Sequence, residues 1–219
     1  DPVAARRRLL FLAHGEPPMR LPESVQAKFV EFLPTLLTCV QRMPDPDAAL
    51  RWFERMVSRA GGRELAYQLF LDHPTVIEVM CRVGGYSHYL SQTLVEHPEY
   101  LDSMVLASYS QFEPSLDDLR QELEARLAPL RTTEQRLDDL RRFRRREMFR
   151  LGVRDLLGMM DVSAVVSGLA DVAEACLRAL VAELAATVPG AAELPFAVIG
   201  VGKLGGRALH YSSDLDVLF

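Results

Sequence analysis

Two aspartates near the end of the sequence have the spacing of a pair of metal ligands. Asp214 and Asp216 are separated by one leucine and enter an apolar run that ends at Phe219. If that run is a β-strand, its side chains alternate between two faces, so both aspartates lie on one face with their Cα atoms about 7 Å apart. Neighbouring carboxylates repel each other unless a cation lies between them, and oxygen ligands favour a hard ion such as Mg²⁺. The pair therefore predicts metal-assisted phosphoryl or nucleotidyl transfer, with Asp214 and Asp216 as catalytic metal ligands.

A glycine-rich segment shortly before the aspartates is suited to hold the phosphates of a nucleotide. Its glycines let backbone N–H groups approach a polyphosphate without obstruction by side chains, its lysine adds a positive charge, and two serines add hydroxyl groups. The predicted nucleotide-binding residues are Gly202, Lys203, Gly205, Gly206, Ser212 and Ser213. The segment has neither the GxxxxGK[ST] spacing of a Walker A loop nor the GxGxxG pattern of a dinucleotide-binding turn.

The elements that must position these residues follow from the apolar periodicity. Most of the sequence repeats apolar residues at helical spacing, including long helices expected at about 134–160 and 163–186. The period changes to that of a strand after Pro195, over residues 196–201 and again over 215–219. The sequence thus predicts a mainly α protein in which a helical bundle leads into the first strands of a truncated α/β core. We expect a helical N-terminal region at 1–133 and, at 134–219, the long helices and the start of that core.

Several prolines are expected to interrupt or end helices in the helical part. Pro34 interrupts the apolar pattern of the helix expected around it. Acidic-His-Pro triplets occur at 72–74 and 96–98. Their histidines could be metal ligands, but neither has a second ligand at a useful spacing. Because proline forces the preceding residue out of the helical conformation, the triplets are better interpreted as two helix ends.

Four arginines recur every fourth residue along the first long helix: Arg142, Arg146, Arg150 and Arg154. Residues at that spacing form one stripe on a helix. The stripe could be a positive surface for a triphosphate or for an acidic protein partner. Alternatively, it is a solvated face paired with nearby acidic residues, where each pair contributes about 0–1 kcal/mol to stability. We favour the second interpretation.

Composition narrows the class of protein. Hydrophobic residues make up 49% of the 219 residues and charged residues 25%, which is enough for a sizeable core and rules out bulk disorder. The net charge of -5 argues against general nucleic-acid or anionic-lipid binding. No apolar run approaches the roughly 18 residues of a membrane span. The three cysteines are far apart and favour a reducing, cytoplasmic compartment over a disulfide scaffold. The sequence opens at Asp1 and stops inside the last apolar run, so we expect a piece of a longer polypeptide.

The run from Val198 to Asp216, VIGVGKLGGRALHYSSDLD, resembles the signature of the bacterial glutamine synthetase adenylyltransferase/adenylyl-removing enzyme family. That family belongs to the DNA polymerase β-like nucleotidyltransferases, so the resemblance implies that the truncated α/β core is a nucleotidyltransferase core. The arginine-rich segment at 140–157 and the segments at 45–47 and 97–102 resemble the family as well. The resemblance therefore covers most of the chain, and its most diagnostic motif lies near the end.

The resemblance implies a specific reaction and specific partners. Family enzymes move AMP from ATP to a tyrosine of glutamine synthetase, and a second, similar domain removes it with phosphate and releases ADP, which regulates nitrogen metabolism. The nitrogen-signalling PII protein and glutamine set the balance. Asp214 and Asp216 would hold Mg²⁺, the Gly202–Gly206 turn would hold phosphates, and a third acidic residue would follow on a later strand. This piece alone is therefore expected to be catalytically incomplete.

Two positions depart from the family pattern, which usually has Glu where Ala208 stands and often has Asn where His210 stands. The segment Tyr211-Ser212-Ser213 resembles the adenylyl-removing half more closely. Two alternatives stay open: a related nucleotidyltransferase that acts on RNA or a small molecule, and a degenerate helical module that only binds a protein. Ala208 is the feature that favours the degenerate module.

Overall fold

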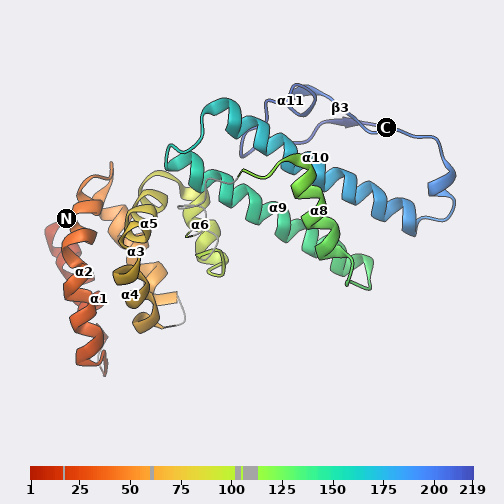
Figure 1. Cartoon of the computed structure of the whole chain (residues 1–219). Helices are drawn as coiled ribbons and strands as arrows, with labels where there is room; N and C mark the ends of the chain where they lie inside the picture. The colour runs from red at the N-terminus through yellow and green to blue at the C-terminus, as the bar shows by residue number, and fades with distance from the viewer. Residues whose placement is uncertain (17, 60–61, 102–104, 106–112) are drawn as a thin grey trace. The chain divides into compact units, whose positions relative to one another are not determined.

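The computed structural model describes residues 1–16, 18–59, 62–101, 105 and 113–219. The chain forms two compact units, residues 1–110 and 111–219, and both consist mainly of helices, as the sequence predicts (Figure 1). In the part of the chain that is described, no helix combines the length and the hydrophobicity needed to cross a lipid bilayer.

The first unit is a bundle of helices around an aromatic core. Its elements are α1 (Pro2–His14), β1 (Gly15–Glu16), β2 (Met19–Arg20), α2 (Glu23–Gln41), α3 (Pro46–Arg59), α4 (Arg63–Asp72), α5 (Pro74–Tyr86) and α6 (His88–Glu96). The rings of Phe29 and Phe32 on α2 pack edge to face, and Phe32 does the same with Tyr67 and Phe70 on α4. All four side chains are buried. Edge-to-face pairs of this kind add to the free energy gained from burial alone.

The prolines act as predicted at the histidines and differently inside α2. His73 ends α4 and precedes Pro74 at the start of α5, and His97 ends α6, which confirms that the triplets mark helix ends. The helix α2, in contrast, runs through Pro34 without ending. The proline removes one hydrogen bond to the carbonyl of Val30, but this residue is 63% exposed, so water can satisfy that carbonyl.

The second unit contains the long helices and the strands that follow them. Its elements are α8 (Leu116–Leu127), α9 (Thr133–Leu156), α10 (Val162–Thr187), the 3₁₀ turn η1 (Ala191–Glu193), β3 (Ile199–Gly200), α11 (Gly202–Gly205) and β4 (Val217–Leu218). The helix α10 packs against both α8 and α9. The domain boundary expected between residues 133 and 134 therefore falls inside this unit, because the shared core takes side chains from all three helices.

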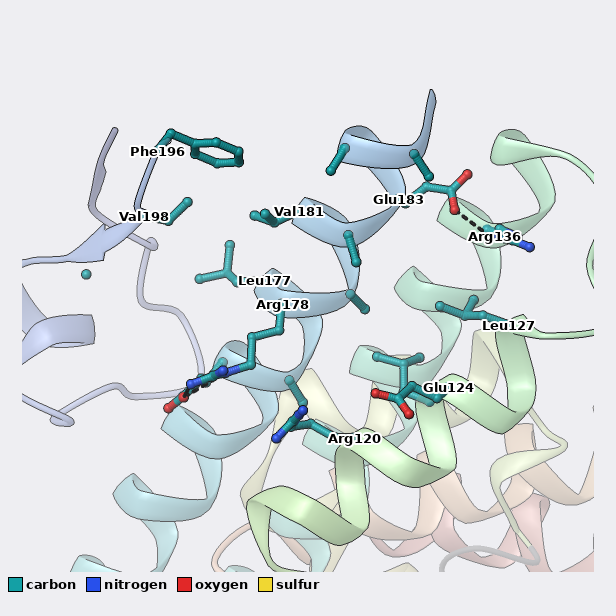
Figure 2. Close-up of a pocket in the computed structure, with 18 of the residues that line it drawn as sticks. Arg120, Glu124, Leu127, Arg136, Leu177, Arg178, Val181, Glu183, Phe196 and Val198 are labelled. Carbon is teal, nitrogen blue, oxygen red and sulfur yellow. Dashed lines mark hydrogen bonds and ion pairs between the residues drawn. The ribbon is translucent and has the colours of Figure 1, made fainter. Parts of the chain in front are cut away.

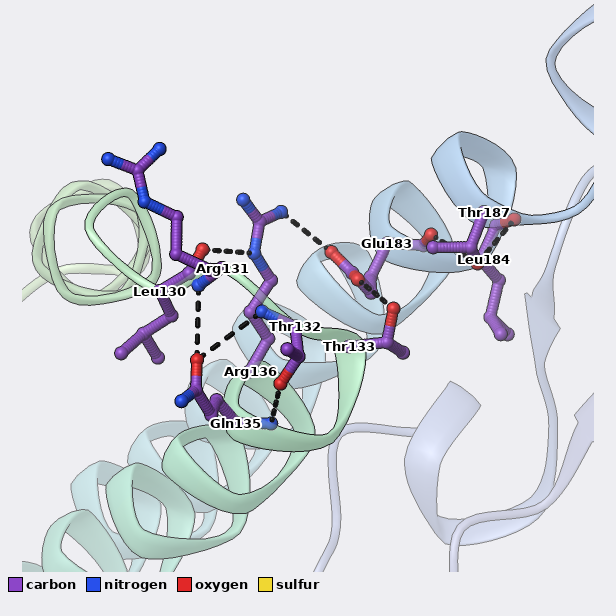
Figure 3. Close-up of polar contacts among 9 residues, drawn as sticks. All are labelled: Leu130, Arg131, Thr132, Thr133, Gln135, Arg136, Glu183, Leu184 and Thr187. Carbon is purple, nitrogen blue, oxygen red and sulfur yellow. Dashed lines mark hydrogen bonds and ion pairs between the residues drawn. The ribbon is translucent and has the colours of Figure 1, made fainter.

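The ends of the long helices are held by polar side chains. Thr132 and Gln135 form a reciprocal capping box at the start of α9, which satisfies backbone N–H groups that the first turn leaves free. Glu183 on α10 accepts hydrogen bonds of 2.8 Å from Thr133 Oγ1 and of 2.8 Å from Arg136 Nη1 (Figure 3). The start of α9 is thus joined to the last part of α10.

The strands are shorter than the sequence predicts. Of the strand expected at 196–201 only Ile199–Gly200 is paired, and it runs antiparallel to Val217–Leu218 of β4. Ile199 lies opposite Leu218, and Gly200 lies opposite Val217. A strand exists only where a neighbour completes its hydrogen bonds. Within the described residues, β4 supplies partners for these two positions alone.

Candidate functional site

The predicted glycine-rich loop forms a single helical turn, α11, directly after β3. The N–H of Gly205 donates to the carbonyl of Val201 at 3.0 Å, and the N–H of Gly206 donates to that of Gly202 at 3.0 Å. The turn is closed by the N–H of Ala208, which donates to the carbonyl of Lys203 at 2.8 Å. These bonds give the segment one defined backbone path between β3 and the connector that leads to the aspartates, residues 207–213.

The turn and the second aspartate are in direct contact. The N–H of Val201 donates to the backbone carbonyl of Asp216 at 2.9 Å, which aligns the start of the turn with the end of the aspartate segment. Gly202 has a φ of +56°, and a Cβ atom there would lie 2.7 Å from Oδ2 of Asp216. Only glycine combines this left-handed backbone with so close a carboxylate. The structure therefore brings Gly202 and Asp216 together.

The two aspartates point to the same side of the chain. Asp214, Asp216 and Leu218 are exposed, whereas the alternating residues Leu215 and Val217 are half-buried. Leu215 packs against the core formed by the long helices. The alternation is that of an extended segment with one face on a core, so the carboxylates lie on the solvent face.

Two of the predicted phosphate-binding glycines have a packing role in this geometry. A Cβ atom at Gly205 would lie 2.4 Å from the carbonyl oxygen of Gly200, and one at Gly206 would lie 3.3 Å from that of Gly202. Their N–H groups donate within the turn rather than outward. The absence of a side chain at Gly205 lets the helical turn fold back onto β3.

The predicted lysine and serines meet at a histidine. Lys203 Nζ lies 2.6 Å from His210 Nε2, and Ser212 Oγ lies 3.2 Å from His210 Nδ1. The backbone N–H of His210 donates to Ser213 Oγ at 2.9 Å. An ammonium group only donates, so Nε2 of His210 is the acceptor in this contact. The sequence marks His210 as an unusual residue of the motif, but its contact with Lys203 follows only from the fold of the connector.

Three side chains of the connector fasten it to the long helices. Arg207 lies against α10, with Nη2 2.5 Å from Asp171 Oδ1. Leu209 is 3% exposed and belongs to the core. Tyr211 donates its hydroxyl hydrogen to Asp155 Oδ2 at 3.0 Å. Arg207 was not among the predicted site residues, since its acidic partners lie more than thirty positions away in the sequence.

The arginine stripe of α9 is largely paired with acidic residues. Arg146 pairs with Glu122 and with Glu147, and Arg150 Nε lies 2.8 Å from Glu147 Oε2. Arg154, which is 2% exposed, pairs with Glu113 at 3.0 Å. The pairing agrees with the favoured interpretation, but the expectation of a solvated face is wrong at Arg154, which is buried, and the partners Glu113 and Glu122 on other segments were not predicted.

A cavity of about 1090 Å³ lies between α8, α10 and the β3–α11 segment. Phe196 and Val198 face Leu177 and Val181 of α10 across it (Figure 2). Gly200 also lines the cavity, and its partner Val217 alternates with Asp216. The cavity therefore lies behind the paired strands, on the side opposite the carboxylates. A ligand bound to the aspartates would not occupy it.

The two carboxylates offer oxygen ligands of the kind that Mg²⁺ takes. Within the described ranges, no group of three or more His, Cys, Asp or Glu side chains is arranged around a common metal position. Mg²⁺ is commonly held by one or two carboxylates together with water and substrate phosphates. Exposed Asp214 and Asp216, the latter lying against the side of Gly202 where a Cβ would be, fit that arrangement.

Comparisons with known proteins place the motif in context. The sequence model of the family described as glutamate-ammonia ligase adenylyltransferase matches residues 77–219. The bifunctional glutamine synthetase adenylyltransferase/adenylyl-removing enzyme of Chromobacterium violaceum is 31% identical over 222 residues, which cover 100% of this chain and 25% of that protein. The enzyme of the same description from Mycobacterium tuberculosis is 35% identical over 195 residues, covering 85% of this chain and 19% of its own length. The chain thus spans a quarter or less of the length of these relatives.

Proposed function

The chain belongs to the glutamate-ammonia ligase adenylyltransferase family, and from this premise we propose that it is part of a Mg²⁺-dependent nucleotidyltransferase that modifies or demodifies a tyrosine of glutamine synthetase. The observation that carries the proposal is the contact between the Asp216 carboxylate and Gly202. A carboxylate that would bind the metal lies there beside an exposed turn that would face the phosphates, and a metal-bound nucleotide would need both.

Asp214 and Asp216 would hold the metal ion, with a further carboxylate supplied by a later strand of the full-length protein. When bound, Mg²⁺ would neutralise phosphate charge and polarise the reacting phosphoryl group. Both aspartates are exposed on the same side, and Leu215 anchors the backbone between them in the core. Their positions are thereby held before any ligand arrives, which lowers the free-energy cost of assembling the site.

The phosphates would lie along the turn, at Gly202 and Lys203. Lys203 would donate to a phosphate oxygen, and His210 would hold its ammonium group in place between ligands. Ser212 and Ser213 would keep the His210 ring and backbone oriented through their hydroxyl groups. Gly205 and Gly206 would contribute by allowing the turn to close onto β3, and so shape the surface that faces the phosphates.

The reaction would proceed in one of two directions. In adenylylation, the tyrosine oxygen of glutamine synthetase bonds to the α-phosphorus of ATP, pyrophosphate leaves, and the hydroxyl proton is released. In removal, a phosphate oxygen bonds to the phosphorus of the tyrosine-linked AMP, the bond between that phosphorus and the tyrosine oxygen breaks, ADP is released as the product, and the tyrosine oxygen takes up a proton. Tyr211-Ser212-Ser213 favours the removing half. We propose a cytoplasmic location and regulation of the full-length enzyme by the PII protein.

The test is an assay of the full-length protein that contains this chain. With ATP labelled in the α-phosphate and Mg²⁺, glutamine synthetase should become labelled on a tyrosine, or labelled adenylyl-glutamine synthetase should release labelled ADP when phosphate is added. Asp216→Asn should abolish the reaction catalysed by this half. Labelling of RNA or of a small molecule instead would overturn the choice of substrate. Failure of the wild-type protein to bind any Mg²⁺-nucleotide would overturn the enzymatic proposal itself.

A further inference from the structure

Arg207, directly after the glycine turn, has a backbone conformation that a side chain disfavours. Its φ is +48°, and among the described residues it is the one non-glycine residue with a positive φ. A Cβ atom makes this left-handed conformation costly, and glycine would adopt it freely. Arginine at this position therefore carries a backbone strain that glycine would not, and the surrounding contacts have to hold it there.

The Arg207 guanidinium contacts one face of α10. Its Nη2 lies 2.5 Å from Asp171 Oδ1 and 3.4 Å from both the carbonyl oxygen and Oγ of Ser167, and its Nη1 lies 3.4 Å from Glu174 Oε2. These three partners are spaced by four and three positions, so they lie along one stripe of the helix. The planar guanidinium suits such a set of acceptors better than a lysine ammonium would.

The backbone transmits this contact to the turn. The N–H of Arg207 donates to the carbonyl of Leu204 at 3.1 Å, and the next N–H, that of Ala208, donates to the carbonyl of Lys203 at 2.8 Å. The other end of the turn is joined to Asp216 through the N–H of Val201. The ion pairs on α10 therefore hold one end of a segment whose other end is hydrogen-bonded to the backbone of Asp216.

We propose that Arg207 is a positioning residue: by binding Asp171 and Glu174 it fixes the glycine turn on α10, so that Gly202 stays beside Asp216 and a Mg²⁺-bound polyphosphate can contact both. This inference rests on the function proposed above and deepens it. Arg207 does not touch the phosphates; it acts through the turn.

The alternative, in which Arg207 contacts a phosphate directly, predicts the opposite change in nucleotide affinity when its acidic partners are replaced. If Arg207 were itself a phosphate ligand, Asp171→Asn with Glu174→Gln would free its guanidinium and would leave nucleotide affinity unchanged or raise it. If Arg207 is a positioning residue, the same double variant weakens affinity, because the turn loses its attachment while the guanidinium remains.

The experiment compares variants of the full-length protein by Mg²⁺-ATP affinity and by hydrogen–deuterium exchange of the peptide spanning residues 199–209 without nucleotide. Arg207→Met and the Asp171→Asn/Glu174→Gln variant should each raise the dissociation constant about tenfold and speed exchange in that peptide, with partial rescue in Arg207→Lys. The matched control is Arg178→Met, because Arg178 pairs with the same Glu174 at 2.7 Å, but this ion pair lies within α10 and does not involve the turn. It should change neither readout.

The outcomes test the positioning role of Arg207 separately from the proposed function. Unchanged exchange in Arg207→Met and in the Asp171→Asn/Glu174→Gln variant overturns the positioning role, whether or not the protein binds nucleotide. Weaker binding in Arg207→Met with unchanged binding in the double variant also overturns it, in favour of a direct contact. A wild-type protein that binds neither Mg²⁺-ATP nor Mg²⁺-ADP refutes the proposed function, while the exchange data still decide whether Arg207 holds the turn.

Discussion

The carboxylate of Asp216 lies directly against the α-carbon of Gly202, so that a Cβ atom at this glycine would be 2.7 Å from Oδ2. The two residues are 14 positions apart, and the intervening connector is fastened to the long helices by Arg207, Leu209 and Tyr211. The glycine turn and the aspartate segment are therefore one structural unit. A change on either side of this contact should affect binding at the other.

Replacement of Gly202 by alanine should impair Mg²⁺-nucleotide binding. The substitution forces a side chain into a left-handed conformation, which costs about 1–2 kcal/mol, and it also pushes the Asp216 carboxylate away. We expect the dissociation constant of Mg²⁺-ATP to rise at least about tenfold, the equivalent of 1.4 kcal/mol, as measured by titration of the full-length protein.

Gly158→Ala is the matched control for this prediction. Gly158 also has a positive φ, of +70°, but no heavy atom lies within 4 Å of the position of its Cβ. It should therefore lose folding stability through the same backbone strain and keep its nucleotide affinity. Equal effects of the two variants on nucleotide affinity would show that backbone strain alone, and not the contact with Asp216, explains the Gly202 result.

The helical part of the fold could be predicted well because amphipathic helices leave a local pattern. The helix expected at 163–186 is found as Val162–Thr187, and Asp161 caps it through a hydrogen bond to the N–H of Ala164. The strands at 196–201 and 215–219 were overestimated. Their length depends on neighbours that are remote in sequence, and apolar periodicity carries no information about those neighbours.

Only part of the site could be predicted, because some of its features follow from a local pattern and others from contacts between elements that are remote in sequence. The shared exposed side of Asp214 and Asp216 follows from the two-residue period of an extended chain, which is a local property. The packing of Gly205 against Gly200 and the attachment of Arg207 to Asp171 are contacts between elements. A glycine-rich segment has the same sequence signature whether its glycines face a ligand or a neighbouring strand, so the sequence alone could not separate these roles.

Loss of the negative charge at Glu183 should destabilise the second unit in a pH-dependent way. Hydrogen bonds from Arg136 and then from Thr133 hold the pKa of Glu183 below its usual value of 4.5. A carboxyl group with a lowered pKa stabilises the fold above its unfolded pKa, and this stabilisation is lost as the pH falls through the folded value. Glu183→Gln should therefore cost about 1 kcal/mol at pH 7, and the difference from wild type should shrink as the pH falls to about 4.

Urea unfolding at both pH values measures this difference. Glu193→Gln in η1 is a suitable control, because that side chain is exposed, and the variant should match wild type at both. A free-energy difference between Glu183→Gln and wild type that is the same at pH 7 and pH 4 would contradict the assigned role of the Glu183 charge.

The fluorescence of Trp52, the single tryptophan of the first unit, can test how tightly that unit is packed. The indole N–H of Trp52 donates to the carbonyl of Ser91 at 3.0 Å, and a Cβ atom at Gly84 would lie 2.6 Å from Cε3 of that ring. Gly84→Ala should displace the ring, shift its fluorescence and destabilise the unit by about 1–3 kcal/mol. Gly62→Ala, where no heavy atom lies within 4 Å of the Cβ position, should leave the emission spectrum unchanged. An unaltered spectrum in Gly84→Ala would refute the tight packing of α5 on Trp52.

The most direct measurement is the affinity of the full-length protein for ATP with and without Mg²⁺, compared between wild type, Asp214→Asn, Asp216→Asn and Asp117→Asn. Asp117 is an exposed carboxylate on α8 whose ion pair with Arg120 does not involve the glycine turn or the aspartates. We expect Mg²⁺ to strengthen ATP binding in wild type and in Asp117→Asn, and the part of this effect that comes from this half of the enzyme to disappear in both site variants. If Asp214→Asn and Asp216→Asn bind Mg²⁺-ATP as tightly as wild type, the two carboxylates are not the metal ligands and the account is contradicted.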